Sequence, residues 1–413
     1  MRPPLYIHIP YCLKKCGYCD FFSKPSGSVP AEYVRAVARQ IDFLAREFCV
    51  EEWKSVYIGG GTPSLLEPDG LTELCRAVTA AAPIASDCEW TIEVNPGSVS
   101  RELLEAARAC GINRLSVGIQ CKNQKVLDVI ERRATVSQIE EAVSLAKNFW
   151  RGPWSADLIA GLPFQTKKDL ARDINFVASN GASHVSLYSL TLEEGTALAK
   201  KIDRGEIPYD EEEAENLWLY GRDLLEERGF LQYEVSNFAK PGFESRHNSA
   251  YWAQENYLGA GAGATGTIYG KPNGMRYTNV LDAAAYIKFW NVPVIARLDR
   301  ATPKGFTDQD APQKALQDLN GGSTPKGFTG QEGAPLPFPC QLESLDMDTQ
   351  EFEYIMTNLR TRRGACAEEY KARYGKDLFA RLGLDKESSQ AQKAARPKGF
   401  TDQKAAAAQW VQK

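Results

Sequence analysis

Short apolar runs alternate with amphipathic segments through the first 240 residues of this chain. Six of the runs are typical of strands: LYIHIP (5–10), SVYIGG (55–60), WTIEVN (90–95), RLSVGIQ (114–120), SADLIAGLP (155–163) and HVSLYSL (184–190). Between residues 33 and 48, apolar side chains recur at steps of three and four, which predicts a helix with one buried face. Near-continuous apolar strands separated by such helices predict an α/β fold with parallel strands covered by helices.

This periodicity leaves two architectures open, a partial (β/α)6 barrel and an open doubly wound sheet. Both collect their chemistry at the C-terminal ends of the strands. Polar and glycine motifs fall at those ends here, since Gly-Gly-Gly-Thr-Pro (59–63) follows the second strand and Glu93 and Gln120 end the third and fourth. Asp157 lies early in the fifth strand. Such side chains are costly in a core unless they are paired or face a polar cleft, so the series predicts a polar mouth.

Three cysteines, Cys12, Cys16 and Cys19, follow the first strand with the spacing C-x-x-x-C-x-x-C. Three thiolates from one loop can hold a [4Fe–4S] cluster and leave one iron without a protein ligand. A zinc site is the alternative, but structural zinc needs a fourth ligand, and the nearest candidate, His8, lies in the preceding strand. A disulfide is disfavoured because the number is odd and no secretory signal is seen.

The bulk composition narrows the class of protein. The 413 residues carry a formal charge of −4 and have a pI of about 5.7, which argues against a general polyanion-binding surface, so no nucleic-acid partner is expected. No stretch resembles a membrane span. Ten cysteines without an export signal fit a reducing compartment, and we expect a cytoplasmic protein.

The composition changes abruptly after residue 300, where the pentapeptide PKGFT occurs three times, at 303–307, 325–329 and 397–401. The surrounding Gly, Pro, Gln, Asp and Ala residues predict segments without a packed core. The expected organisation is a core with the chemical site (1–240), an extension of that core (241–300), a flexible insertion (301–340), a small helical C-terminal domain (341–385) and a poorly ordered tail (386–413).

Several motifs together resemble one family. They are YIHIPYCLKKCGYCDF, YIGGGTPSLL, IEVNPG, INRLSVGIQ, ADLIAGLPFQT, YEVSNFAKPG and HNSAYW. The chain resembles radical S-adenosylmethionine (SAM) proteins of the oxygen-independent coproporphyrinogen III oxidase group, and within that group the HemW-type heme chaperones. The resemblance spans about residues 5–300 and resumes at 347–382. It implies a partial (β/α)6 radical SAM barrel followed by a smaller mixed and helical C-terminal region.

The resemblance also implies three cofactors and their residues. The cluster would be held by Cys12, Cys16 and Cys19. SAM would be bound by Tyr6, Tyr18, Gly60, Gly61, Thr62, Glu93, Gln120, Arg132 and Asp157, with Arg133 as the neighbouring option for Arg132. Heme would be bound by His247, Tyr251 and Trp252 of the H-N-x-x-Y-W motif. Of the three histidines, His8 precedes the cluster loop and His184 opens a core strand, which leaves His247 as the best imidazole ligand; a structural role at a domain junction is its alternative.

The implied function is that of a heme chaperone, which passes heme to an acceptor protein. A membrane-associated acceptor is one option, and the electron donor is not specified. The first rival is an oxygen-independent coproporphyrinogen III dehydrogenase, but Phe21 stands where the decarboxylating enzymes carry a further cysteine, and the lead-in before Cys12 is short. The second rival, a radical SAM modifier of RNA, would require a basic surface.

This chain also departs from the family pattern at two places. Thr265 stands where relatives usually have a histidine, and Cys121-Lys122 stands where they usually have Ser-Phe.

Overall fold

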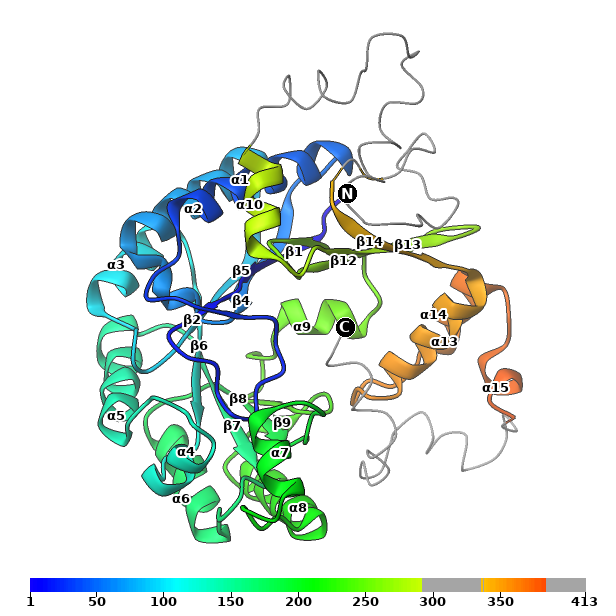
Figure 1. Cartoon of the computed structure of the whole chain (residues 1–413). Helices are drawn as coiled ribbons and strands as arrows, with labels where there is room; N and C mark the ends of the chain where they lie inside the picture. Colours follow the sequence, from blue (N-terminus) through cyan, green and yellow to red (C-terminus); the bar gives the residue numbers. More distant parts are fainter. Residues whose placement is uncertain (292–335, 337, 384–413) are drawn as a thin grey trace.

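The computed structural model describes residues 1–291, 336 and 338–383. Most of the predicted insertion and all of the predicted tail lie outside these residues. Within them the fold is α/β, as predicted, with one large sheet, helices along it, and a smaller C-terminal region (Figure 1).

The large sheet has nine strands in the order β11-β1-β4-β5-β6-β7-β8-β10-β9. The six predicted strands are confirmed as β1 (Pro4–Ile9), β4 (Trp53–Gly60), β5 (Ile84–Val94), β6 (Arg114–Gln120), β7 (Trp154–Ala160) and β8 (His184–Ser189). These six are parallel, and their order follows the chain without a reversal. A doubly wound sheet requires a reversal, so the structure decides for the partial barrel.

The connections between parallel strands are right-handed, so the helices collect on one side of a sheet that never reverses. The segments that connect β1 to β8 contain α1 (Ala31–Glu47), η1 (Pro63–Leu66), α2 (Glu67–Ala81), α3 (Arg101–Ala109), α4 (Gln124–Val129), α5 (Val136–Ser144), η2 (Leu145–Trp150) and α6 (Lys167–Ser179). The helices α7 (Ala197–Asp203) and α8 (Glu211–Glu227) follow β8. Figure 1 shows α2 to α6 along the outer side of the curved sheet. The predicted helix at 33–48 is α1, whose Val34, Val37, Ile41 and Leu44 are buried.

Residues after the six-strand core complete the large sheet and its inner side. β11 (Leu258–Ala260) pairs in parallel with β1, whereas β10 (Asn237–Ala239) pairs antiparallel with β8 and with β9 (Leu231–Gln232). The short helix α9 (Arg246–Trp252) lies on the inner side of the sheet, opposite the outer helices (Figure 1). The predicted extension therefore supplies an edge strand and part of the barrel interior.

A smaller region of mixed structure follows. The strands β12 (Thr265–Ile268), β13 (Gly274–Asn279) and β14 (Cys340–Leu345) form a second sheet, which is followed by α13 (Met347–Asn358), α14 (Ala367–Tyr374) and α15 (Leu378–Arg381). The helix α10 (Ala283–Asn291) packs instead against α1 of the core. The last three helices share their own small core of Tyr354, Tyr370 and Leu378. Across the described part of the chain, no helix has both the length and the apolarity needed to cross a membrane.

One buried ion pair joins the second sheet to these helices. Arg276 of β13 lies 2.8 Å from the Glu353 carboxylate of α13, and the two side chains are only 10% and 3% exposed. Arg276 also reaches Glu343 of β14 at 3.2 Å, but that carboxylate is 47% exposed. Because water screens the second pair and not the first, the junction depends on Glu353.

The substitution Arg276→Met should leave the buried Glu353 carboxylate unpaired and destabilise the chain by about 3–5 kcal/mol. Urea denaturation would measure the loss. Glu343→Gln is the matched control, since it removes only the exposed partner and should cost less than about 1 kcal/mol. Equal effects of the two variants would contradict the assignment of the buried pair as the main contact.

Candidate functional site

The three motif cysteines lie on one closed loop after β1. The short strands β2 (Tyr11–Cys12) and β3 (Lys24–Pro25) pair in parallel and bring the two ends of the loop together. The Lys24 N–H donates to the Pro10 carbonyl at 2.6 Å, and the Ser26 N–H donates to the Cys12 carbonyl at 2.8 Å. Cys12, Cys16 and Cys19 are partly buried and unbonded to one another, so their thiols are free to bind a cofactor.

Distant parts of the chain hold this loop in place. The Gly17 N–H donates to the Ile130 carbonyl at 2.9 Å, and the Gly17 carbonyl accepts from the Leu198 N–H at 2.7 Å. Beside them, Lys14 of the loop and Lys201 of α7 both bind Glu131 at 2.8 Å. These two ammonium groups lower the pKa of Glu131 to about 2, so this carboxylate is charged at any ordinary pH.

The surroundings of the thiols fit an anionic iron–sulfur cluster. The Thr62 hydroxyl donates to Cys12 Sγ at 3.5 Å, and Arg132 Nη1 donates to Cys16 Sγ at 3.7 Å. The Arg132 Nε is buried and has no hydrogen-bond partner among the described residues. Burial raises the pKa of Cys12 and of Cys19, so the free thiols are neutral until a metal takes their protons.

The same geometry does not favour a zinc ion. No three His, Cys, Asp or Glu side chains of the described residues converge on a point where one metal ion could sit. A four-iron cluster needs no such convergence, because each thiolate binds a different iron. His8, the fourth zinc ligand considered above, accepts from the Tyr6 hydroxyl at Nδ1 (2.9 Å) and donates from Nε2 to the Phe22 carbonyl (3.1 Å).

The glycine turn after β4 packs against the cluster loop so closely that no side chain would fit. Gly60 has a φ of 112°, and a Cβ there would lie 2.6 Å from the His8 ring. At Gly61, a Cβ would lie 2.7 Å from the Tyr11 carbonyl oxygen and 3.0 Å from Cys12 Sγ. Glycine is therefore required at both positions, and it leaves backbone groups open to a ligand beside Cys12.

Two carboxylates of the predicted SAM set face the barrel interior. Glu93 accepts from the Tyr57 hydroxyl at 2.8 Å and from the Gly60 N–H at 3.1 Å, and Asp157 accepts from the Ser116 hydroxyl at 3.0 and 3.1 Å. Burial, together with the charge of Asp157, raises the pKa of Glu93 to about 7; burial also raises the pKa of Asp157. Neither forms an ion pair within the described structure, so the pair suits a cationic ligand such as SAM.

A hydrogen-bonded hub around Arg132 and Asn95 links the strand ends and the glycine turn to the cluster loop. Arg132 Nη2 donates to Asn95 Oδ1 and to the Gly118 carbonyl, both at 2.6 Å, and Asn95 Nδ2 donates to the Thr62 hydroxyl at 2.9 Å. The Tyr18 hydroxyl lies 3.5 Å from Arg132 Nη1. Gln120 belongs to the same group, since a Cβ on Gly118 would lie 3.0 Å from Arg132 and 3.3 Å from Gln120. Of the two candidate arginines, Arg132 makes these contacts and Arg133 is exposed.

Some residues of this site were not identified from the sequence. Asn95, the centre of the hub, stands directly after a strand in the motif IEVNPG, from which only Glu93 was selected. Tyr57 binds Glu93 and stacks against Tyr6, with 6.2 Å between ring centroids. Its position within an apolar strand gave no indication of a polar role. An amide at a strand end, by contrast, is a feature that could have identified Asn95.

The predicted heme ligand His247 lies inside the barrel, on α9. It is 1% exposed; Nδ1 hydrogen-bonds to the Ser55 hydroxyl at 2.9 Å and Nε2 to the Tyr251 hydroxyl at 2.8 Å. Its ring stacks on Tyr57 at 5.1 Å, which connects it to Glu93. Burial lowers the pKa of His247 to about 3, so the imidazole is neutral. Trp252, at the end of the same helix, is partly buried.

The departures from the family pattern are packed without strain. Thr265 of β12 hydrogen-bonds to Thr278 of β13 at 3.0 Å through their hydroxyls. Cys121 is fully buried, and Lys122 forms an ion pair with Glu140 at 2.7 Å. Phe21, in the position of the extra cysteine of the decarboxylating enzymes, is 55% exposed on the cluster loop.

Comparison with known proteins shows the family to which this chain belongs. The family described as the Radical SAM superfamily matches residues 6–177. The heme chaperone HemW of Bacillus subtilis is 37% identical over 286 residues, which cover 68% of this chain and 74% of that protein. The chain belongs to the HemW family of radical SAM proteins. Membership in this family implies a [4Fe–4S] cluster and SAM, which the cysteine loop and the paired carboxylates fit.

Two further relatives define how far the similarity extends. The bovine mitochondrial radical S-adenosyl methionine domain-containing protein 1 is 40% identical over 267 residues, or 64% of this chain, and the match covers only 60% of the bovine protein. Among solved structures, coproporphyrinogen III oxidase (HemN) from Escherichia coli aligns with a TM-score of 0.68 at 19% identity, covering 92% of this chain and 80% of that chain. That alignment shows that the HemW-family chain shares the radical SAM fold.

The substitution Asn95→Ala should remove an acceptor from Arg132 and a donor from Thr62 at once. Because both partners are largely enclosed, we expect a loss of about 1–3 kcal/mol in unfolding free energy and a lower iron content after cluster reconstitution. Asn148→Ala, which removes an exposed amide bonded to Ser144, is the control and should change stability by less than about 0.5 kcal/mol. Unchanged iron content in Asn95→Ala would argue against the hub.

Proposed function

We propose that this chain is a heme chaperone, which binds heme together with one [4Fe–4S] cluster and SAM and transfers the heme to an acceptor protein. The observation that carries the proposal is the similarity to curated heme chaperones at 35–37% identity over more than two thirds of their length. The proposed heme acceptor is another protein, and a membrane-associated protein is one option for it. The proposed compartment of the chain is the cytoplasm. No nucleic-acid partner is proposed.

The site geometry supports the cofactor contacts that we propose. When bound, a cluster with one open iron can chelate SAM and pass an electron to it. Cys12, Cys16 and Cys19 would hold the cluster, while Gly60, Gly61 and Thr62 would offer backbone and hydroxyl groups beside it. Tyr6, Tyr18, Gln120 and Arg132 would line the SAM pocket, and Glu93 and Asp157 would accept hydrogen bonds from SAM.

The enzyme alternative, oxidative decarboxylation of coproporphyrinogen III, receives less support. The solved oxidase shares the fold with this chain, but at 19% identity the likeness says nothing about activity. Phe21 occupies the position of the further cysteine and exposes a phenyl ring beside the cluster loop instead of a thiol. Conversion of coproporphyrinogen III to protoporphyrinogen by reconstituted protein under anaerobic conditions would reverse the preference.

The chaperone proposal is tested by uptake and release of heme. Reconstituted protein should bind ferric heme saturably at about one heme per chain, and it should pass that heme to an apo-hemoprotein such as apomyoglobin faster than an equal amount of heme bound to serum albumin. Difference absorbance follows both steps. Absence of saturable uptake at micromolar heme would refute the proposal.

SAM binding should depend on pH through Glu93. With its pKa near 7, Glu93 is mostly neutral at pH 6.0 and mostly charged at pH 7.5, and only the charged form attracts a cationic ligand. We therefore expect SAM affinity to rise about five- to tenfold between these two pH values. Equilibrium dialysis of reconstituted protein measures the change.

The matched variant is Glu93→Gln, which keeps the acceptor oxygen for Tyr57 but cannot ionise. It should bind SAM more weakly at pH 7.5 and show a nearly flat pH dependence. Should the variant keep the full pH dependence of the original protein, the titrating group lies elsewhere.

A further inference from the structure

All three histidines of the chain already use both ring nitrogens. His8 and His247 do so as described above, and His184 bonds to the Ser155 hydroxyl at 2.7 Å and to the Tyr233 hydroxyl at 2.9 Å. Each is at least 94% buried. Iron ligation by His247 would require one buried ring nitrogen to give up its hydrogen bond to Ser55 or to Tyr251. An open cavity with suitable chemistry lies elsewhere in the fold.

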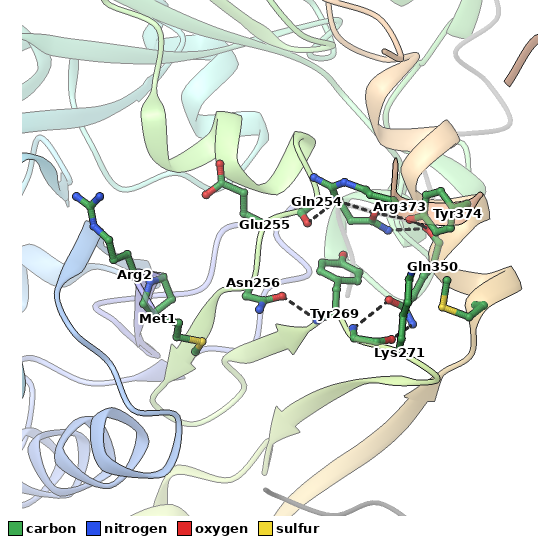
Figure 2. A pocket seen from close by; sticks show the side chains of 13 residues that line it. Met1, Arg2, Gln254, Glu255, Asn256, Tyr269, Lys271, Gln350, Arg373 and Tyr374 are labelled. Carbon is green, nitrogen blue, oxygen red and sulfur yellow. Dashed lines mark hydrogen bonds between the residues drawn. The ribbon is translucent and has the colours of Figure 1, made fainter. Parts of the chain in front are cut away.

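Such a cavity, of about 450 Å³, lies where the second sheet meets the C-terminal helices and the start of the chain (Figure 2). Its walls include Tyr269, Lys271, Met347, Gln350, Arg373 and Tyr374. In Figure 2, Met1 and Arg2 stand on one side of it, Gln350, Arg373 and Tyr374 on the other, and Tyr269 between them. The cavity lies outside the cluster and SAM site.

Hydrogen bonds between distant segments build this cavity and fix its shape. Gln350 of α13 binds both backbone groups of Gly270, accepting at 3.2 Å and donating at 2.9 Å. The Tyr374 hydroxyl lies within 2.9 Å of both Gln254 Oε1 and the Gln350 carbonyl. Asn256 accepts from the Tyr269 N–H at 2.8 Å. The walls are therefore preformed, as is usual for small-molecule sites.

The charge of the cavity is positive and uncompensated. Arg373 donates to the Ala253 and Gln254 carbonyls at 3.2 and 3.3 Å, and it has no carboxylate partner in the described structure. Lys271 is exposed and forms no ion pair there either. The remaining charges of the lining are neutralised from outside, since Glu255 binds Lys54, Arg2 binds Glu52 and the α-amino group of Met1 binds Glu51. Two positive charges are thus left for a ligand.

We propose that this cavity is the docking site for heme, an inference that rests on the proposed function. Heme is a flat apolar ring with two carboxylates, and the cavity offers tyrosine rings and a Met347 thioether as walls and two cations for the carboxylates. Methionine is a known axial ligand of heme iron, so Met347 is the candidate ligand. The hydroxyls of Tyr269 and Tyr374 already bind Glu353 and the two glutamines Gln254 and Gln350, so these tyrosines would serve as walls only.

The position of the cavity separates heme from the cluster. Its residues Pro3 and Gln254 to Asn256 directly precede β1 and β11, whereas the cluster loop follows the other end of β1. A six-residue strand at about 3.3 Å per residue places the two sites roughly 20 Å apart. Heme uptake should therefore be the same with and without a reconstituted cluster.

Heme titration of the full chain tests the site. Lys271→Gln should weaken ferric heme binding roughly two- to fivefold, as expected for one partly exposed charge pair, and the double variant Lys271→Gln/Arg373→Gln should weaken it further. Glu255→Gln, which makes the cavity more positive, should strengthen binding. Lys168→Gln, an exposed lysine of α6, is the matched control and should bind as the original chain does.

Thermal melts show whether Arg373→Gln still folds, and Lys271→Gln carries the test if it does not. No heme uptake by the original chain would refute the proposed function. Normal uptake that Lys271→Gln and Glu255→Gln leave unchanged, or that only His247→Ala abolishes, would overturn this site alone. Competition by glutarate at concentrations similar to those of heme would also overturn this site, because the cavity would then bind dicarboxylates in general.

Discussion

The fold depends on one constraint, the unreversed order of its parallel strands. Because the crossover helices lie on the outside, the described part of the chain covers the inner face of the sheet with the short helix α9 and loops alone. An inner face of that kind cannot be a uniform apolar core. It instead contains polar side chains that hydrogen-bond to one another, as His184 does with Ser155 and Tyr233.

The same constraint explains why acidic side chains can lie in the interior of the barrel. Glu93 and Asp157 receive hydroxyl and backbone donors but no cation, so their charge is only partly compensated. A site of this kind favours a positively charged guest and costs stability when empty and ionised. Asn95 and Arg132 connect the glycine turn at Thr62 to the cysteine loop, and the same turn donates to Glu93 through the Gly60 N–H.

Much of this could be predicted from the sequence, and the reasons are specific. The strands were found because their apolar runs are continuous, and the cysteine loop because its spacing is rare. The choice between barrel and open sheet could not be made, because strand order is set by which strands pair, and periodicity contains no pairing information. His247 was selected as a heme ligand by its motif, but only the three-dimensional packing reveals Ser55 and Tyr251 at its two nitrogens. The cavity at the C-terminal helices combines residues from 1 to 374, which no local pattern can connect.

The two backbone bonds of Gly17 also bear on the order of folding. One joins the cysteine loop to residue 130 and the other to residue 198, so part of what fixes the loop is made much later during synthesis. Contacts of such long sequence separation form late, because the chain between them must first be ordered. During translation, the cysteines therefore leave the ribosome well before the surroundings that shape them exist. Cluster insertion into this chain is expected to be a post-translational event, which follows the folding of the barrel up to α7.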